Sequence, residues 1–176
     1  MAEKYQIPYL SSGHVFREMS KEKTALGRFV KETINAGYLI PDDKTVEIVM
    51  EYLSKPEYTN GFILDGFPRT VPQAQAFEKF THGEEIVILI DVSDKEALWR
   101  LSGRVSDRED ETLQAIRKRI NLFHEKTSQV LDYYAERKHL AVVDGEKTVE
   151  EVFAQIVEKV EQIEALQHKK AAEKAE

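Results

Sequence analysis

The sequence predicts an α/β fold, a parallel β-sheet with flanking helices. Four short apolar runs mark the strands, and the run "IVILI" is continuously apolar rather than alternating. A continuously apolar strand is typical of a parallel sheet that is covered on both faces. Helical segments separate the runs, which indicates repeated strand–helix units. The strands are expected over residues 7–10, 62–64, 86–92 and 140–143.

The first two helices are predicted from their boundaries. A helix is expected over residues 13–36, with Gly37 as its C-cap. The pair Asp42-Asp43 is expected to start a second helix over residues 44–53, because carboxylates stabilise a helix N-terminus. Apolar residues at helical spacing place one face of this second helix against the core.

The later helices are predicted from apolar periodicity and capping boxes. Residues 109–137 carry apolar side chains at helical spacing, and Ser106 and Glu109 have the spacing of a capping box at their start. Thr148 and Glu151 form a second candidate box. The amphipathic stripe that follows consists of Val149, Val152, Phe153, Ile156, Val157, Val160 and Ile163. From Gln167 the chain is polar, and residues 167–176 are expected to be a frayed or solvated tail.

Composition excludes several classes of protein. The net charge of −7 argues against a general nucleic-acid binder, although a local arginine cluster can still bind an anion. The absence of cysteine excludes disulfides and thiolate metal sites, and it fits a reducing cytoplasm. No apolar run reaches the roughly 18 residues that span a bilayer. The first ten residues show no signal-peptide pattern.

The segment "SSGHVFR" follows the first predicted strand and is suited to bind an anion. Free backbone N–H groups at a helix start can hold an anion, and Ser12 and Arg17 lie within about one turn of that start. The same pattern fits an ordinary serine N-cap followed by an exposed arginine. The residues by themselves leave both interpretations open.

The segment "LDGFPRT" places phosphate-binding chemistry at the end of the second predicted strand. Gly66 permits close approach of the backbone to a ligand, and Pro68 fixes the turn. Arg69 presents a planar fork suited to phosphate oxygens. Asp65 could order metal-bound water beside phosphates, and Gln73 could both donate to and accept from a base. A strand-to-helix turn with a structural aspartate is the alternative, but the string is too specific to favour it.

An arginine series follows the third predicted strand. Arginines spaced by four repel one another weakly on a helix face, so their convergence is better explained by a polyphosphate. A solvated charged face with local ion pairs is the alternative interpretation. The series consists of Arg100, Arg104, Arg108, Arg117 and Arg119.

Together these segments resemble the adenylate kinases, a family of nucleoside monophosphate kinases. The likeness covers nearly the whole chain in the family's order, through "YLSSGHVFR", "AGYLIPDD", "WRLSGRVSDREDE" and "VDGEKTVEEV". The most characteristic match is "GFILDGFPRTVPQA". The resemblance implies a P-loop NTPase-like parallel sheet in one domain over residues 1–166. Within it the family has an AMP-binding helical hairpin at about 12–41 and a lid, here very short, at about 104–108.

The resemblance also implies which residues bind each nucleotide. The AMP site would consist of Ser12, Arg17, Tyr38, Leu39, Ile40, Gly66, Phe67, Pro68, Arg69, Gln73, Arg108 and Arg119. In it Arg69 would hold the AMP phosphate and Gln73 the adenine. ATP would contact Arg100, Arg104, Glu146 and Lys147.

The implied reaction is reversible phosphoryl transfer, ATP + AMP to two ADP. Arg69, Arg108 and Arg119 would serve as catalytic cations, the last two bridging the donor and acceptor phosphates. Asp65 and Asp110 would act through water on the Mg²⁺ that accompanies ATP. Such a transfer needs in-line positioning, charge neutralisation and exclusion of water rather than a protein nucleophile.

Three departures from the family pattern are local. Ser12 stands where threonine is usual and keeps the hydroxyl, and His14 stands where aspartate is usual. Only Val-Ser-Asp separates Arg104 from Arg108, so the lid is very short and no structural zinc is expected.

The fourth departure is the absence of the family's phosphate-binding loop, G-x-x-x-x-G-K-[ST]. None of the eight glycines, at positions 13, 27, 37, 61, 66, 83, 103 and 145, is followed by Lys-Ser or Lys-Thr. In the alignment "MAEKYQIPY" corresponds to the end of the family's first helix, so Met1 is expected to be internal to a longer protein. A genuine short form is the alternative.

The family's strand order, 2-3-1-4-5, makes the absent strand the central one. Without it the first two strands cannot pair with the last two, and two inner edges expose unpaired backbone groups. The chain alone is therefore expected to be unstable or molten. Either a UMP/CMP kinase or a non-catalytic remnant that binds AMP remains an alternative function. The expected partners are ATP, AMP and ADP, with no nucleic acid or membrane, and a cytoplasmic monomer is expected.

Overall fold

The strands form two separate parallel pairs. The structure is a computed structural model that describes residues 1–103 and 112–175, with side chains described as far as residue 166. In this part of the chain the pairs make two sheets, and no ladder joins them. The α/β fold is as the sequence predicted, and the first two strands do not pair with the last two, as expected. The first pair is β1 (Tyr9–Ser11) with β2 (Ile63–Asp65), and the second is β3 (Val87–Asp91) with β4 (Leu140–Asp144).

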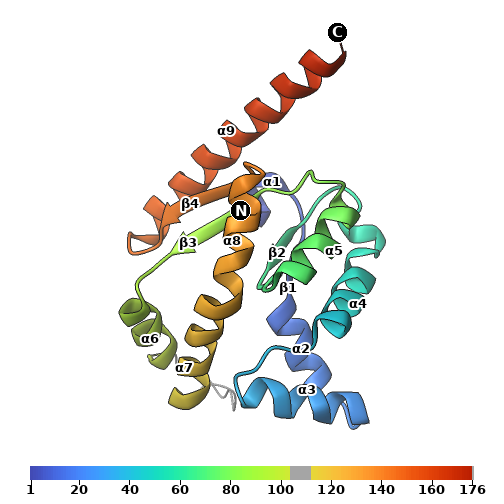
Figure 1. Ribbon diagram of the computed structural model, residues 1–176, viewed down its shortest axis with the longest axis vertical. Helices are drawn as coiled ribbons and strands as arrows, with labels where there is room; N and C mark the ends of the chain where they lie inside the picture. The colour runs from blue at the N-terminus through green and yellow to red at the C-terminus, as the bar shows by residue number, and fades with distance from the viewer. Residues whose placement is uncertain (104–111, 176) are drawn as a thin grey trace.

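Helices surround the two strand pairs (Figure 1). In this view α8 crosses between the pairs, α4 and α5 lie beside β1 and β2, and α9 extends away from the rest of the chain. The helices are α1 (Ala2–Tyr5), α2 (Ser12–Ser20), α3 (Ala25–Asn35), α4 (Asp42–Leu53), α5 (Val71–Thr81), α6 (Asp94–Ser102), α7 (Leu113–Leu122), α8 (Ser128–Glu136) and α9 (Val149–Ala175). A 3-10 turn, η1 (Pro56–Tyr58), and a π-helical segment, η2 (Phe123–Thr127), complete the described elements.

The hydrophobic core is unevenly divided between the two strand pairs. The larger cluster joins α2, α3, α4 and α5 to β1 and includes Val30, Val49 and Phe77. Two smaller clusters serve the β3–β4 side. They contain Ala74, Val130 and Tyr134 in one case and Val143, Ile156 and Val160 in the other. The first strand pair therefore has much more buried apolar contact than the second.

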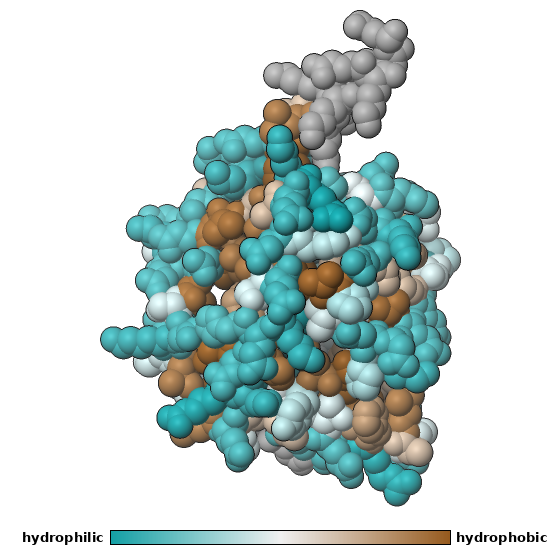
Figure 2. Space-filling model, in the orientation of Figure 1, coloured by the Kyte–Doolittle hydropathy of each residue, from teal (hydrophilic) through white to brown (hydrophobic). Residues whose placement is uncertain are grey.

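The outer surface drawn in Figure 2 has no single hydrophobic patch. On this face apolar side chains show in several small areas between charged ones. Scattered apolar residues of this kind are normal on a protein surface. Of the helices in the described residues, none has both the length and the apolar character needed to cross a membrane.

The single helix predicted over residues 13–36 is wrong, because the structure divides it into α2 and α3. The Thr24 side chain accepts a hydrogen bond from the N–H of Gly27 at 2.9 Å, so it caps a new helix. A Cβ at Gly27 would lie 2.4 Å from the carbonyl oxygen of Glu22, so glycine is needed at this tight corner. The predicted stop is confirmed: Gly37 follows α3 with a φ of +75°.

The helix predicted over residues 109–137 corresponds to α7, η2 and α8 in succession. Thr112 caps its described start by accepting from the N–H of Ala115 at 3.1 Å. The predicted box of Ser106 and Glu109 lies outside the described residues. The π-helical segment adds a residue to one turn, a feature often found at functional sites.

In the last helix, α9 (Val149–Ala175), the predicted N-terminal cap is confirmed, but the predicted apolar stripe is only partly buried. Thr148 and Glu151 form the predicted capping box, with reciprocal hydrogen bonds of 3.0 and 3.3 Å. Ile156 and Val160 are buried as expected, but Val149 is 81% exposed and Phe153 40% exposed. α9 runs through the region expected to be a frayed tail, as far as Ala175. The first strand also differs slightly: it begins at Tyr9, not at residue 7.

Candidate functional site

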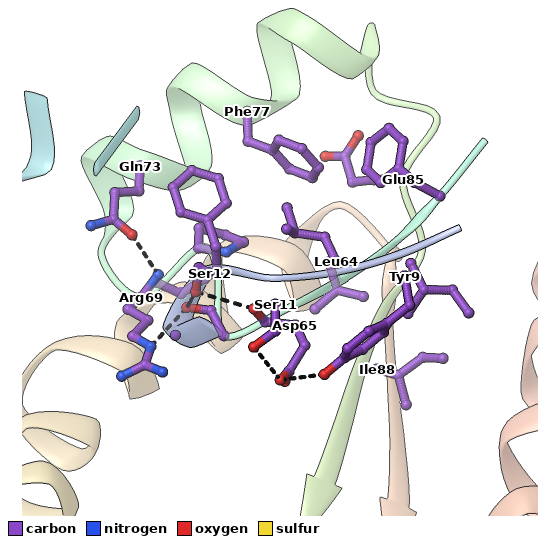
Figure 3. Close-up of a pocket in the computed structure, with 18 of the residues that line it drawn as sticks. Tyr9, Ser11, Ser12, Leu64, Asp65, Arg69, Gln73, Phe77, Glu85 and Ile88 are labelled. Atoms are coloured by element: carbon purple, nitrogen blue, oxygen red, sulfur yellow. Dashed lines mark hydrogen bonds between the residues drawn. The ribbon is translucent and has the colours of Figure 1, made fainter. Parts of the chain in front are cut away.

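The loop after β2 holds an arginine against its own backbone (Figure 3). Gly66 has a φ of +77°, a conformation that favours glycine. The Nε of Arg69 donates to the carbonyl oxygen of Gly66 at 2.7 Å, which leaves the two terminal guanidinium nitrogens for other partners. The Thr127 hydroxyl donates to the carbonyl oxygen of Arg69 at 3.0 Å and ties this loop to η2. The fold therefore presents the guanidinium fork in one fixed place.

Ser12 joins the start of α2 to the same loop. Its side chain is 3% exposed, and its hydroxyl lies 3.1 Å from the carbonyl oxygen of Asp65 and 2.9 Å from that of Gly66. The hydroxyl has one proton, so it donates to these carbonyls in turn and shapes the loop. The capping role that the sequence left open belongs to Ser11, whose Oγ accepts from the N–H of His14 at 3.4 Å.

Three arginines from different elements lie close enough to influence one another. Burial lowers the pKa of Arg69 most, and the charges of Arg119 and Arg17 lower it further, while Asp65 opposes them. Arg17 is in the last turn of α2, but its guanidinium reaches back to the start of the helix, because a Cβ on Gly13 would be 3.1 Å from its Nη1. Arg17 comes from α2, Arg69 from the loop after β2 and Arg119 from α7. A bound anion would compensate the positive charge of such a group of arginines.

Gln73 is held on both ends of its amide by protein groups. It is 1% exposed, its Oε1 accepts from the N–H of Arg69 at 2.8 Å, and its Nε2 donates to Asp42 Oδ1 at 2.8 Å. Thr70 donates to the same Asp42 oxygen at 2.9 Å. From the sequence, Asp42 is predicted only as the start of a helix. No local signal pairs it with residues 28 and 31 positions later, so this contact was not predictable from spacing.

Asp65 stands at the carboxyl end of β2 with local hydrogen-bond partners. Its Oδ2 accepts from the Tyr9 hydroxyl at 2.8 Å and from Ser11 Oγ at 3.3 Å. The carboxylate is exposed, so it remains open to water. In the described residues no cluster of three histidine, cysteine, aspartate or glutamate side chains could hold a metal ion directly. The exposed carboxylate of Asp65 therefore fits a contact to Mg²⁺ through water.

One large cavity, of about 1900 Å³, contains most of the residues predicted for the acceptor nucleotide. Tyr38 is 55% exposed at its rim, and the Lys118 ammonium lies 4.8 Å from the centre of its ring. Ile40 and Phe67 are buried in the wall. The predicted residues that line this cavity are Ser12, Arg17, Tyr38, Leu39, Ile40, Asp65, Gly66, Phe67, Pro68, Arg69, Gln73 and Arg119.

The predicted ATP residues that the structure describes form a separate group. Arg100 pairs with Glu96 at 2.6 Å, and Lys147 lies 3.9 Å from Asp144. Glu146 accepts from the Ser93 hydroxyl at 2.7 Å, and this hydrogen bond is the main reason that its pKa is lowered. These residues lie just after β3 and β4, and the described cavity is not lined by them. Arg104, Arg108 and Asp110 lie outside the described residues.

A profile of the adenylate kinase family matches residues 1–139. The chain belongs to the adenylate kinase family. It is 36% identical over 169 residues to the adenylate kinase of Azobacteroides pseudotrichonymphae genomovar. CFP2, which covers 93% of this chain and 88% of that protein. It is 34% identical over 194 residues to the adenylate kinase of Clostridium novyi (strain NT), covering 92% and 90%. For the Parabacteroides distasonis adenylate kinase the identity is 36% over 168 residues, covering 92% and 88%.

Family membership gives the arginine-lined site a chemical context. The adenylate kinase relatives support a nucleoside monophosphate kinase, a phosphotransferase, as the activity to which this fold is suited. The best-formed part of the site in this adenylate kinase family member is the loop after β2. There the half-buried Arg69 guanidinium, the Ser12 hydroxyl and the left-handed Gly66 are held together by hydrogen bonds to the Gly66 carbonyl oxygen.

Proposed function

We propose that this chain binds AMP as the phosphoryl acceptor of the reaction ATP + AMP to two ADP. The observation that carries the proposal is the group of Arg17, Arg69 and Arg119 around the Gly66 loop. The charges of Arg119 and Arg17 both act against the charge of Arg69, and a phosphate dianion at the loop would compensate all three. A planar guanidinium also matches two phosphate oxygens at once.

The chemistry demanded of such a site is positioning and charge neutralisation. Arg69 is fixed by its hydrogen bond to Gly66, so it can hold the AMP phosphate without losing much side-chain entropy. Arg119 and Arg108 are assigned to the bridge between donor and acceptor phosphates. We assign the exclusion of water to closure of the short lid, which consists of about residues 104–108.

The base of AMP is assigned to the part of the cavity near Tyr38, Leu39 and Ile40, with Phe67 in its wall. The proposed contact of Gln73 with adenine carries a condition. Because both ends of its amide are engaged by Arg69 and Asp42, the side chain must exchange at least one of these partners for the base. The helical hairpin of about 12–41 is the element expected to adjust when that happens.

The donor side is the less complete half. ATP is assigned to Arg100, Arg104, Glu146 and Lys147, and Mg²⁺ would accompany ATP and meet Asp65 and Asp110 through water. The 176 residues contain no G-x-x-x-x-G-K-[ST] string to hold the donor's phosphates. A chain that binds AMP without transferring phosphate is therefore the second candidate function. ADP as product, a monomeric state and a cytoplasmic location remain predictions.

The acceptor base is tested by comparing nucleoside monophosphates. We expect calorimetric titration to give AMP a dissociation constant at least tenfold lower than those of UMP, CMP and GMP. Inorganic phosphate serves as the control for binding by the arginines alone. Preference for UMP or CMP would favour the UMP/CMP kinase alternative, and equal affinity for all four would leave no role for a base pocket.

Gly66→Ala is expected to weaken AMP binding at least tenfold. A Cβ at this position would lie 2.8 Å from Ser12 Oγ and 3.0 Å from Arg69 Nη2, so it displaces the phosphate-binding group itself. Gly61→Ala is the matched control, because Gly61 also has a positive φ, +110°, but its Cβ would meet only Ile7 Cγ2 at 3.5 Å. Both variants carry the backbone strain of about 1–2 kcal/mol. Equal losses of AMP affinity in the two variants would refute the specific role of the Gly66 loop.

A further inference from the structure

The wide π-helical turn η2 joins α7 to α8 in one continuous column (Figure 1). At this turn the N–H of Ser128 donates to the carbonyl oxygen of Phe123, five residues earlier, so the turn holds one residue more than a turn of α-helix. The Gln129 side chain donates to the carbonyl oxygen of Glu125 at 2.7 Å in the same segment. Such turns are rare, and the extra residue changes the direction of the side chains that follow it.

The extra residue brings Thr127 onto the face of the column that carries Arg119. Thr127 lies eight positions after Arg119, and in a regular α-helix eight positions exceed two full turns by about 80°. One residue added to a turn makes these eight positions equivalent to about seven, which complete two turns to within about 20°. Both residues line the same cavity, as this geometry requires. A regular helix would turn the Thr127 side chain away from the face of Arg119.

Thr127 connects this face to the arginine loop after β2. Its hydroxyl donates to the carbonyl oxygen of Arg69 at 3.0 Å, across 58 positions of sequence. Arg69 is also held by its N–H, which donates to Gln73 Oε1 at 2.8 Å, and by its Nε, which donates to the Gly66 carbonyl oxygen at 2.7 Å. The last two bonds lie within residues 66–73. Of the three, the bond from Thr127 is therefore the one that fixes the loop relative to a different part of the chain.

The relative placement of two arginines depends on this bond. The charge of Arg119 lowers the pKa of Arg69, after the larger effect of burial, so the two side chains lie within electrostatic range of each other. Like charges oppose the approach of the loop to α7, and the hydrogen bond from Thr127 holds the two elements together. A phosphate that contacts both guanidinium groups binds more tightly when both are already in place, because ordering a side chain or loop on binding lowers the affinity.

We propose that Thr127 is a positioning residue for the phosphate of the acceptor nucleotide, and that the extra residue of η2 gives it this role. The inference rests on the proposed function, because it takes AMP as the nucleotide whose phosphate lies between Arg69 and Arg119. In this assignment Thr127 does not touch the phosphate and acts through the backbone of Arg69. Binding of the phosphate therefore depends on the Thr127 hydroxyl, and binding of the nucleoside does not.

The test is calorimetric titration of the whole 176-residue chain with AMP and, separately, with adenosine, which lacks the phosphate. Thr127→Val keeps the branched shape of the side chain and removes the hydroxyl. We expect it to lower AMP affinity about fivefold, the usual effect of a lost neutral hydrogen bond, and to leave adenosine affinity unchanged. Thr127→Ser keeps the hydroxyl and should restore the AMP affinity of the original chain. A loss of the same size for adenosine would show a general structural effect and overturn the inference.

Two further variants locate the effect. Ser128→Ala removes the neighbouring hydroxyl, which donates within its own helical column to the carbonyl oxygen of His124 at 2.6 Å, and it should leave AMP affinity unchanged. In an Arg119→Met background, Thr127→Val should cost less than about twofold, because the spacing of the two arginines no longer matters. Equal losses in Thr127→Val and Ser128→Ala would overturn the inference, and so would the full loss in the Arg119→Met background.

The original chain separates this inference from the proposed function on which it rests. If that chain binds no AMP, the proposed function is refuted and the inference with it. If it binds AMP and Thr127→Val binds AMP equally well, the inference alone is refuted.

Discussion

Replacement of Arg69 by methionine is expected to lower AMP affinity at least a hundredfold. The side chain is half-buried beside Ser12 and Gly66, and its Nε already donates to the Gly66 carbonyl oxygen. The two terminal nitrogens can therefore form a bidentate contact with phosphate. Hydrogen bonds to charged groups contribute about 1.5–3 kcal/mol each. A hundredfold loss corresponds to about 2.7 kcal/mol and is a conservative expectation for two of them.

The controls for Arg69 separate charge from geometry. Arg69→Lys keeps the charge but loses the planar fork and the hydrogen bond from Nε, so affinity should be intermediate. Arg28→Met removes an exposed arginine from α3 and should leave AMP affinity unchanged. Calorimetric titration of the three variants with AMP measures all of these effects. If Arg69→Met and Arg28→Met have the same affinity, the phosphate does not bind where we propose.

The second large effect concerns the stability of the chain by itself. We expect thermal unfolding without a single cooperative transition, and amide exchange in β3 and β4 at least tenfold faster than in α2 and α4. The β1–β2 side has the larger hydrophobic cluster, whereas the β3–β4 side has two clusters of three buried residues. Inner strand edges without partners add to this imbalance, because unpaired backbone groups are costly when buried.

Near-UV circular dichroism and hydrogen exchange measure this prediction. Exchange in α2 and α4 provides the internal control in the same sample, because both helices belong to the larger hydrophobic cluster. One sharp thermal transition with native-like near-UV circular dichroism, in the chain alone, would contradict it. Uniform exchange rates across the two strand pairs would do the same.

Features that depend on neighbouring residues were predictable from the sequence. The apolar run at β3, the capping box of Thr148 and Glu151 and the stop at Gly37 each rest on a local pattern, and the structure has them. The Gly66 loop was recognisable because a positive-φ glycine, a proline and an arginine follow a strand within a few residues. The missing loop string predicted that the first two strands would not pair with the last two, and the described strands form two separate sheets.

Features that depend on tertiary contacts were not predictable. The corner between α2 and α3 interrupts a sequence with helical character, because Thr24 caps a new helix and Gly27 permits close packing. Asp42 reaches Thr70 and Gln73 only after the chain folds. Val149 continues the apolar stripe in the sequence, but in the structure it lies at the exposed start of α9. The spacing of apolar residues does not show at which residue a helix begins to pack against the core.

We propose that these 176 residues form the acceptor half of the phosphoryl-transfer site and do not form the donor half. Separate calorimetric titrations of the purified chain with AMP and with MgATP test it most directly. We predict a saturable heat of binding for AMP, none for MgATP, and no formation of ADP when both are present. Robust ADP formation, or binding of MgATP without binding of AMP, would contradict the account.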